Sequence, residues 1–307
     1  MSFFILWQLI SLKEWDYLVS HSNGGDNINI GFIGAGKVGV SLGKYFSENN
    51  IKIIGYYSKS IESAKDAAFF TKSNYFKDVE ELIDKSDTIF ITTPDGVIKD
   101  VWDSIKQLSI KNKIICHCSG SLSSKIFSNI EEYNSYGYSI HPMFAFSDKY
   151  NSHKKLKEAF ITLEGSNEYL DKMKNLFESL GNKVQVISSE NKAKYHAASV
   201  FASNQVIGLI KTSVDLLKQC GFDDSNALEA LSPLMLNNMI NVIQNGMIQS
   251  LTGPIERGDI GTVKSHLNVL DDEDKELYKL ISKKLLDIAI IKNKDRDYTN
   301  LKVIMEE

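Results

Sequence analysis

The chain has 307 residues, of which 43% are hydrophobic and 24% are charged, as in an ordinary water-soluble globular protein. This length accommodates two domains of average size. The formal net charge of −4, without a long basic run, argues against a nucleic-acid-binding protein. Three cysteines are too few for a disulfide framework and are typical of a protein from the reducing cytoplasm.

A short apolar run, Phe3–Trp7, lies near the start of the chain. It is too short for a membrane span, and no basic stretch or small-residue cleavage pattern marks a signal peptide. We expect residues 1–26 to form a poorly ordered extension, with a helix on a membrane surface as the alternative. No other segment is long and apolar enough to cross a bilayer, so we expect no membrane partner.

The segment 28–39 combines an apolar strand, a glycine turn and the start of an amphipathic helix. Its glycines have the spacing G-x-G-x-x-G, which in a strand–turn–helix context predicts a dinucleotide site. The first glycine permits the tight turn, the second lets the backbone approach a pyrophosphate, and the third lets helix and strand pack closely. The residues expected to bind the cofactor here are Gly34, Ala35, Gly36, Lys37, Val38 and Gly39.

Two other motifs are excluded. Residues 31–37 fit the spacing of a nucleoside-triphosphate loop, but Val38 stands where that loop needs a hydroxyl for Mg²⁺. Cys116-His117-Cys118 suggests a metal site, but it ends an apolar strand and has no second ligand pair at zinc spacing. We therefore interpret these three as buried strand residues and expect no metal.

Apolar runs with strand character alternate with helical patterns from residue 28 to about 188. The predicted strands are 28–33, 51–57, 87–92, 113–117, 136–140, 160–163 and 183–187. The predicted helices are 37–48, 61–69, 78–84, 96–107, 121–131 and 168–180. This alternation predicts an α/β domain over residues 27–189, with a mostly parallel sheet covered on both faces.

Helical patterns dominate the rest of the chain, at 190–219, 224–246, 259–269 and 272–290. Residues 190–307 are therefore expected to form a helical domain for substrate binding and dimerisation. The stretch 190–219, predicted as one long helix, is apolar nearly all round. We expect it to be buried, either within the monomer or between subunits.

The end of the second predicted strand indicates which nicotinamide cofactor is bound. An NAD-selective domain has an Asp or Glu there, but this chain has Ser58, Lys59 and Ser60. Two hydroxyls and a cation favour the 2′-phosphate of NADPH, and the alternative is a solvated polar turn. Thr93 and Pro94 follow the strand 87–92 at the carboxyl edge of the sheet, where they are expected to pack against the dinucleotide.

Candidate chemistry lies in several polar clusters. Ser119 either donates to a substrate or caps the segment that follows it. His141, at the end of a strand, is either a substrate contact or a structural histidine. His196 and Asn204 lie on the predicted long helix, about 12 Å apart along its axis, and would address opposite ends of a site. Arg257 suits bidentate binding of a carboxylate, or alternatively forms an ion pair with Asp259.

Together these clusters resemble a bacterial family of NADP oxidoreductase-like proteins, in which a Rossmann-like domain precedes a helical domain of formerly unknown function. The matching stretches are Gly-Phe-Ile-Gly-Ala-Gly-Lys-Val-Gly (31–39), Thr-Pro-Asp (93–95), Cys-Ser-Gly (118–120), His-Pro-Met (141–143), Tyr-His-Ala-Ala (195–198), Ala-Ser-Asn (202–204) and Leu-Thr-Gly-Pro-Ile-Glu-Arg-Gly-Asp (251–259). The architecture is similar to ketopantoate reductases, pyrroline-5-carboxylate reductases and 3-hydroxyacid dehydrogenases. The resemblance implies an all-α second domain like the C-terminal domain of 6-phosphogluconate dehydrogenase.

Some members of this family resemble an alternative ketopantoate reductase of pantothenate biosynthesis. The resemblance implies a cytoplasmic homodimer that uses NADPH to reduce a small 2-oxo acid, with 2-dehydropantoate as the best single candidate. His196, or alternatively His141, would protonate the alkoxide, because a histidine titrates near neutral pH. Asn204 and Ser119 would orient the substrate or the nicotinamide, and Arg257 would hold the substrate carboxylate.

One departure from the related enzymes concerns the proton donor. Hydroxyacid dehydrogenases and the commoner ketopantoate reductases carry a catalytic Lys four residues before an Asn on this helix. If Asn204 matches that Asn, position 200 is Val and the usual donor is missing. The alternatives are a reductase of imines or 3-hydroxyacids, and an NADP-binding sensor without turnover.

Overall fold

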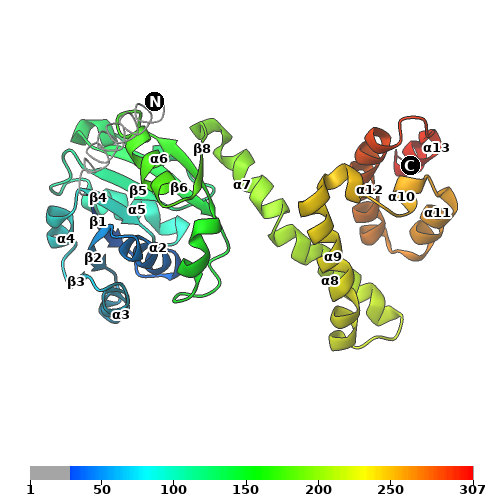
Figure 1. Cartoon of the computed structure of the whole chain (residues 1–307), viewed down its shortest axis with the longest axis horizontal. Coiled ribbons are helices and arrows are strands. Elements are labelled where there is room, and N and C mark those ends of the chain that lie inside the picture. Colours follow the sequence, from blue (N-terminus) through cyan, green and yellow to red (C-terminus); the bar gives the residue numbers. More distant parts are fainter. Residues whose placement is uncertain (1–27, 307) are drawn as a thin grey trace, which may run out of the picture. The chain divides into compact units, whose positions relative to one another are not determined.

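The computed structural model describes residues 28–306, so the predictions for residues 1–26 lie outside the described residues. The chain divides into two compact units, with the boundary between Val200 and Phe201 (Figure 1). None of the described helices is both long and apolar enough to span a membrane.

The described part of the first unit is built on one eight-stranded sheet with the order β3-β2-β1-β4-β5-β6-β7-β8. Its strands are β1 Asn29–Ile33, β2 Lys52–Tyr57, β3 Asn74–Phe76, β4 Thr88–Ile91, β5 Ile114–His117, β6 Tyr136–Met143, β7 Phe160–Gly165 and β8 Lys183–Val186. Neighbouring strands are parallel except β6 and β7, which pair antiparallel. The predicted α/β fold is confirmed. The sequence did not reveal β3, because this strand has three residues of which only Phe76 is buried.

Helices cover both faces of the sheet, as a mostly parallel sheet requires. On one face lie α2 (Lys37–Glu48), α3 (Ile61–Thr71) and α6 (Leu170–Ser179), and on the other lie α4 (Val79–Lys85) and α5 (Asp95–Ile105). Aromatic side chains fill the two cores. Phe32 stacks on Tyr56 with ring centroids 5.0 Å apart on the first face. Trp102 meets Phe127 at 5.5 Å on the second.

The helix predicted over 121–131 is wrong. The chain instead forms two short 3₁₀ segments there, η1 (Ser124–Ile126) and η2 (Ile130–Tyr133). Asn129 between them has a left-handed backbone with φ 58°, which no α-helix accommodates. Two further 3₁₀ segments connect elements of this unit, η3 (Ser152–Glu158) and η4 (Ser189–Asn191).

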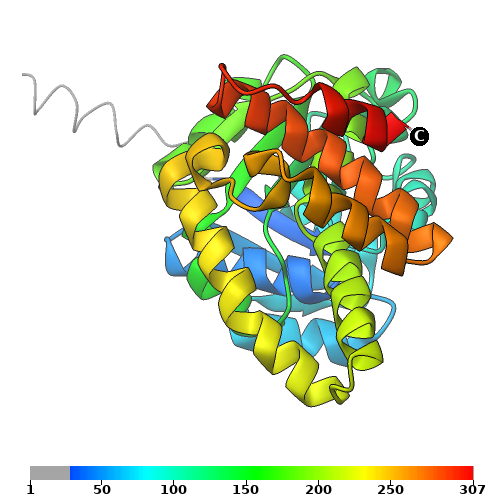
Figure 2. The same ribbon diagram turned by 90° about the vertical axis from the view of Figure 1, so that its right-hand side faces the viewer.

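The second unit is helical, as predicted. Its helices are α8 Asn204–Gln219, α9 Asp224–Ser250, α10 Pro254–Arg257, α11 Ile260–Val269, α12 Asp272–Lys292 and α13 Thr299–Glu306. Figure 2 shows α8 and α9 as an antiparallel pair joined by a short turn. The core of this unit lies among α10 to α13, where Val263, Leu286 and Ala289 are buried.

The single helix predicted over 190–219 is also wrong. Helix α7 (Lys192–Phe201) ends before Ser203, whose φ −128° and ψ −80° are not helical, and α8 begins at Asn204. The estimate of the separation between His196 and Asn204 assumed one straight helix, so it does not apply. Of the two expected forms of burial, burial within the monomer is not found for α8, which has no buried residue, and burial between subunits stays a prediction.

Candidate active site at the carboxyl edge of the sheet

The glycine turn after β1 is shaped for a pyrophosphate. Gly34 has φ +109°, and a Cβ there would lie 2.9 Å from the backbone of Thr92. A Cβ on Gly39 would overlap Thr92 Oγ1, whereas a Cβ on Gly36 would meet nothing within 4 Å. The flanking glycines are therefore needed for packing, and the space over Gly36 is open. Helix α2 starts at Lys37 without a side-chain cap, so its first N–H groups are available to phosphate oxygens.

The Ser58–Ser60 turn connects the carboxyl end of β2 to α3. Ser60 Oγ accepts a hydrogen bond from Ser63 N at 3.2 Å and caps this helix. Ser58 is half-buried and Lys59 is exposed. A cation next to a helix N-terminus is a favourable place for a phosphate group. The turn therefore fits the 2′-phosphate of NADPH, with Ser60 also holding the helix start.

Two threonines connect β4 to the glycine turn. Thr92 Oγ1 donates to Gly34 O at 3.0 Å and thereby fixes the turn. Thr93 Oγ1 is buried and has no hydrogen-bond partner in the structure. Pro94 then caps α5, which begins at Asp95. Because a buried hydroxyl without a partner is costly, Thr93 offers a contact for a bound ligand.

Ser119 lies in the turn after β5, and its hydroxyl is already bonded within the protein. Its Oγ donates to Asp95 Oδ2 at 2.7 Å and accepts from the N–H groups of Ser121 at 3.2 Å and Leu122 at 3.0 Å. Only 4% of the residue is exposed. These bonds favour the capping alternative for Ser119 over donation to a substrate.

The two histidines that the sequence analysis gave as alternative proton donors lie close together in the structure. His141 lies on β6 and His196 on α7, and their ring centroids are 6.1 Å apart. A Cβ on Gly120 would overlap His196 Nδ1 and would lie 3.0 Å from His141 Nε2. The glycine of the Cys-Ser-Gly stretch is therefore what allows both imidazoles to approach this turn.

Tyr195 fixes the orientation of His141. Its hydroxyl lies 2.7 Å from His141 Nδ1. Burial, and after it the charge of Lys192, lowers the pKa of His141 to about 4, so this imidazole is neutral at physiological pH. Burial also lowers the pKa of His117, on β5, to about 4. When the tyrosine donates to Nδ1, His141 carries its own proton on Nε2, on the side of Gly120.

Sequence reasoning missed Lys192, at the start of α7. Only 2% of this residue is exposed, and its Nζ has no hydrogen-bond partner. The Nζ lies 5.3 Å from the centre of the Tyr195 ring. Burial lowers its pKa to about 8. The available signal was the spacing of Lys192 and His196, because residues four apart share one face of a helix.

Unpartnered polar atoms gather at this edge of the sheet. In the described chain, five buried side-chain nitrogen or oxygen atoms lack a hydrogen-bond partner, and three of them belong to Thr93, Lys192 and His196. Buried polar groups are normally paired, so such a concentration indicates a binding site for a polar ligand. No group of three or more His, Cys, Asp or Glu side chains suited to a metal ion occurs among residues 28–306. Cys116 and His117 are fully buried strand residues, as interpreted from the sequence.

Asn204 and Arg257 belong to the second unit. Asn204 starts α8, and its Oδ1 accepts from Ser203 Oγ at 3.1 Å. Arg257 is 58% exposed and lies 4.0 Å from Asp259 Oδ2, so the alternative ion pair exists at the limit of contact. Asp259 mainly caps α11, accepting from Thr262 N at 3.0 Å. The roles of Asn204 and Arg257 in substrate binding stay predictions.

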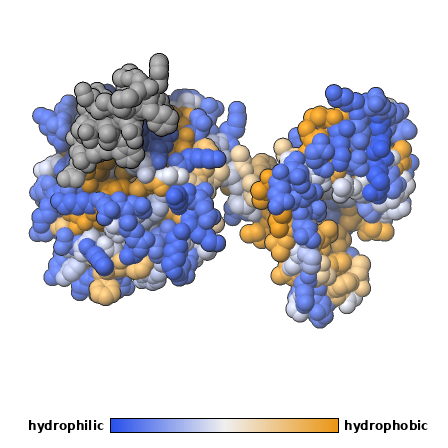
Figure 3. All heavy atoms as spheres, viewed as in Figure 1, coloured by the Kyte–Doolittle hydropathy of each residue, from blue (hydrophilic) through white to orange (hydrophobic). Residues whose placement is uncertain are grey.

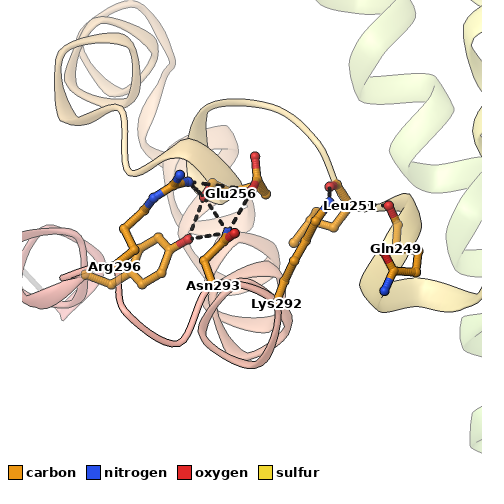
Figure 4. Close-up of polar contacts among 7 residues, drawn as sticks. Gln249, Leu251, Glu256, Lys292, Asn293 and Arg296 are labelled. Carbon is orange, nitrogen blue, oxygen red and sulfur yellow. Dashed lines mark hydrogen bonds and ion pairs between the residues drawn. The ribbon is translucent and has the colours of Figure 1, made fainter.

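Glu256, next to Arg257, is held by the chain that connects α12 to α13 (Figure 4). Its carbonyl oxygen accepts from Arg296 Nη1 at 2.6 Å and from Tyr298 Oη at 2.5 Å. Its carboxylate accepts from Asn293 Nδ2 at 2.7 Å. Lys292 Nζ donates to Leu251 O at 2.7 Å, at the start of the same loop. The loop 251–259 is therefore held by hydrogen bonds at Leu251, where it starts, and at Glu256, next to Arg257.

Comparisons with known proteins identify two matching regions of the chain. Residues 29–119 match the family described as NADP oxidoreductase coenzyme F420-dependent, and residues 159–285 match a domain of unknown function, DUF2520. A crystal structure of a Thermotoga maritima protein is 29% identical, with a TM-score of 0.67 over 85% of this chain and 98% of that one. No protein of curated function matches the sequence significantly.

More distant structures share the fold. A candidate NADP oxidoreductase from Bacteroides fragilis is 23% identical, with a TM-score of 0.67 over 86% of this chain and all of that one (100%). A pyrroline-5-carboxylate reductase from Coxiella burnetii is 18% identical, with a TM-score of 0.58 over 88% of this chain and 98% of that one.

The glycine turn, the polar edge beside it and the family matches lead to one conclusion. The cofactor is NADP(H), as the absence of an acid after β2 predicted. The chain is an NADP-dependent oxidoreductase with the fold of pyrroline-5-carboxylate reductases, and it joins an NADP oxidoreductase domain to a DUF2520 domain.

Proposed function

We propose that the protein uses NADPH to reduce a small 2-oxo acid, and that 2-dehydropantoate, which would give pantoate for pantothenate biosynthesis, is the best single candidate. The observation that carries this proposal is the concentration of unpartnered polar atoms of Thr93, Lys192 and His196 at the carboxyl edge of the sheet. These atoms are the donors that a bound carbonyl and nicotinamide would satisfy.

In such a reduction, some residues of the first unit bind the cofactor and others bind the substrate carbonyl. Bound NADPH supplies the hydride. The open space over Gly36 accommodates the pyrophosphate, and Ser58 and Lys59 bind the 2′-phosphate. His141 and His196 hold the carbonyl oxygen. Because burial keeps His141 neutral, its N–H polarises the carbonyl by donating a hydrogen bond and does not transfer its proton.

The charge of the site favours a 2-oxo acid over an imine. Imine reduction passes through a cationic iminium group, which the buried ammonium of Lys192 would repel. A carbonyl develops negative charge on its oxygen during reduction, and a carboxylate carries negative charge throughout, so the same ammonium stabilises both. Because imine reductases have a similar architecture, the assay below also includes an imine substrate.

The experiment is an assay of NADPH oxidation by the purified protein with 2-dehydropantoate. Pyrroline-5-carboxylate and a 3-hydroxyacid, the latter tested with NADP⁺, serve as alternative substrates. We expect turnover of 2-dehydropantoate with NADPH and slower turnover with NADH. In Lys59→Ala the preference for NADPH over NADH should be smaller. No turnover at millimolar 2-dehydropantoate would remove the pantoate assignment. Tight NADPH binding without turnover of any of these substrates would favour the sensor alternative.

Arg257 is proposed to bind the substrate carboxylate, and Asn204 to orient the substrate. The hydrogen bonds to the Glu256 carbonyl support this role, because they hold the backbone from which the exposed Arg257 side chain extends. We expect Arg257→Ala to raise the KM for the oxo acid and to leave NADPH binding unchanged. Arg257→Lys should restore part of the affinity, because one cation remains but the bidentate geometry is lost.

We also propose that the active form is a homodimer that uses the α8–α9 pair. Large apolar side chains on these helices are exposed, and Figure 3 shows a hydrophobic surface over this region. The exposed residues are Ile207, Leu209, Leu228, Leu234, Leu236, Met239, Ile240, Val242, Ile243, Met247 and Ile248. Monomeric proteins rarely expose so many contiguous apolar side chains. A sedimentation measurement of the molecular mass tests this prediction.

A further inference from the structure

Lys192 is a charged residue in an unusual environment. Among the residues that the structure describes, it is the only buried lysine, and its Nζ has no hydrogen-bond partner. An ammonium group has three N–H donors, and removing it from water without a partner is strongly unfavourable. Nearby carboxylates and the Tyr195 ring compensate this penalty only in part, because none of them accepts a hydrogen bond from Nζ, so the position is explained better by function than by stability.

The acidic neighbours of Lys192 are engaged elsewhere. The carboxylates of Asp95 and Glu164 lie near enough to attract the ammonium. However, Asp95 accepts hydrogen bonds from Ser119 at 2.7 Å and from Ser121 at 3.2 Å. Glu164 accepts from the backbone N–H of Ser124 at 2.7 Å and from its hydroxyl at 2.6 Å. Both carboxylates therefore lower the energy of the cation without fixing its position.

Four of the other titratable groups around Lys192 hold no proton that they can readily give up near neutral pH, and His196, the donor expected from the sequence, is the alternative. Burial keeps His117 and His141 neutral, each with a pKa of about 4. Burial raises the pKa of the Cys118 thiol to about 12 and also raises that of the Tyr195 hydroxyl. The ammonium of Lys192, whose pKa burial lowers to about 8, is therefore an acid matched to proton donation near neutral pH.

We propose that Lys192 is the proton donor of the reduction, an inference that rests on the proposed function. When the carbonyl carbon receives the hydride, the electron pair of the C=O π bond moves to the oxygen. An N–H bond of Lys192 breaks and its proton forms the O–H bond, which leaves a neutral amine and an alcohol. The cofactor is oxidised by two electrons and the carbonyl is reduced by two. The amine then regains its proton from water.

The substrate's carbonyl oxygen would also supply the missing hydrogen-bond acceptor for two buried nitrogen atoms. Lys192 and His196 are four residues apart on α7, so they share one face of the helix. Lys192 Nζ and His196 Nδ1 both lack a partner. A carbonyl oxygen bound between them would take a hydrogen bond from each, and the neutral His141 would orient it from β6.

The test compares Lys192→Met with Lys194→Met in the full chain. Lys194 lies on the same helix and is exposed, so it is the matched control. We expect Lys192→Met to lower kcat by at least about 100-fold, the usual contribution of a general acid. NADPH binding, followed by the fluorescence of the nicotinamide, should be unchanged in both variants. The activity of Lys194→Met should equal that of the wild type.

Two further measurements separate a proton donor from a structural lysine. The Tm of Lys192→Met should rise, because a methionine of similar length relieves the burial of an unpaired charge, whereas loss of a structural lysine would lower it. Activity of the wild type should decline as pH rises above about 8, the pKa that burial gives Lys192. NMR titration of the lysine Nζ groups in nitrogen-15-labelled protein should show this transition in the wild type and not in Lys192→Met.

The outcomes are distinguishable. A wild type that reduces the oxo acid together with a fully active Lys192→Met would overturn the proton donor and leave the proposed function intact. Absence of turnover in the wild type, with the NMR transition present, would remove the proposed function. A lowered Tm and no NMR transition near pH 8 would make Lys192 a structural residue.

Discussion

In the first unit, both faces of the sheet are covered, and Phe32, Trp102 and Phe177 are fully buried. In the second unit, α8 has no buried residue, and α9 buries only Ala227 and Ser250 over its 27 residues. A buried aromatic side chain contributes about 2 to 3 kcal/mol, so the first unit can stabilise itself. The α8–α9 pair has few such contacts within the chain. The comparison shows that the first unit buries its apolar faces within itself, whereas α8 and α9 bury few of their own residues, as the proposed dimer would lead one to expect.

The largest expected effect comes from charging the exposed face of α9. Ile243 is 82% exposed and Leu236 is 63% exposed, so neither contributes much to the isolated chain. If α8 and α9 pack against a second copy, Leu236→Asp combined with Ile243→Asp should convert a dimer into a monomer. Burying two unpaired carboxylates would cost several kcal/mol. Sedimentation at micromolar concentration measures the effect.

Val269 on α11 provides the control for that prediction. It is 78% exposed and lies outside the α8–α9 pair. Val269→Asp should leave the mass unchanged. If the double variant and this control have the same mass, the exposed face of α9 is not the surface through which two copies associate.

The next effect concerns the glycine turn of the first unit. Gly36→Ala should fold normally, because its Cβ meets nothing within 4 Å, but it should weaken NADPH binding roughly ten- to hundredfold by occupying the space for the pyrophosphate. Isothermal titration with NADPH gives the affinity. Gly208→Ala on α8, also in open space, is the control and should bind NADPH normally. Equal affinity in both variants would show that the open space at Gly36 is not the phosphate site.

Acid should destabilise the first unit through its neutral histidines. His117 and His141 have pKa values near 4 in the folded protein because of burial, against an ordinary value of 6.5. Between these values the unfolded chain binds protons that the folded chain does not. Stability should therefore fall as pH drops from 6.5 towards 4, by up to about 3 kcal/mol for each histidine.

Urea titrations of the wild type and of His117→Gln at several pH values measure this loss. The variant should lose less stability over the same range, because it lacks one of the two groups. An identical pH dependence in the two proteins would contradict the assignment of a buried, neutral His117.

The smallest effect is expected at Glu256 in the second unit. Tyr298→Phe removes the hydrogen bond from its hydroxyl to Glu256 O and should cost about 1 kcal/mol of unfolding free energy. Tyr150→Phe, at a residue that is 40% exposed, is the control and should be neutral. Because Glu256 precedes Arg257, Tyr298→Phe should also raise the KM for the oxo acid slightly, while kcat stays constant. A larger change in kcat would mean that this loop does more than hold Arg257.

Local features of the sequence determined much of this molecule. The alternation of strands and helices specified the covered parallel sheet, because the hydrophobic period reports which face of an element is buried. Gly34, Gly36 and Gly39 specified the turn, because their spacing reflects backbone geometry within one strand–turn–helix unit. The missing acid after β2 indicated NADPH in the same way.

Tertiary structure decided what depends on residues far apart in the chain. The helix predicted over 190–219 is interrupted at Ser203, and the sequence there has no pattern that predicts the interruption. His141 and His196 approach each other only because β6, α7 and the Gly120 turn converge. Lys192 looks in the sequence like any lysine at a helix start. It becomes a candidate acid only because the fold removes it from water without giving it a partner.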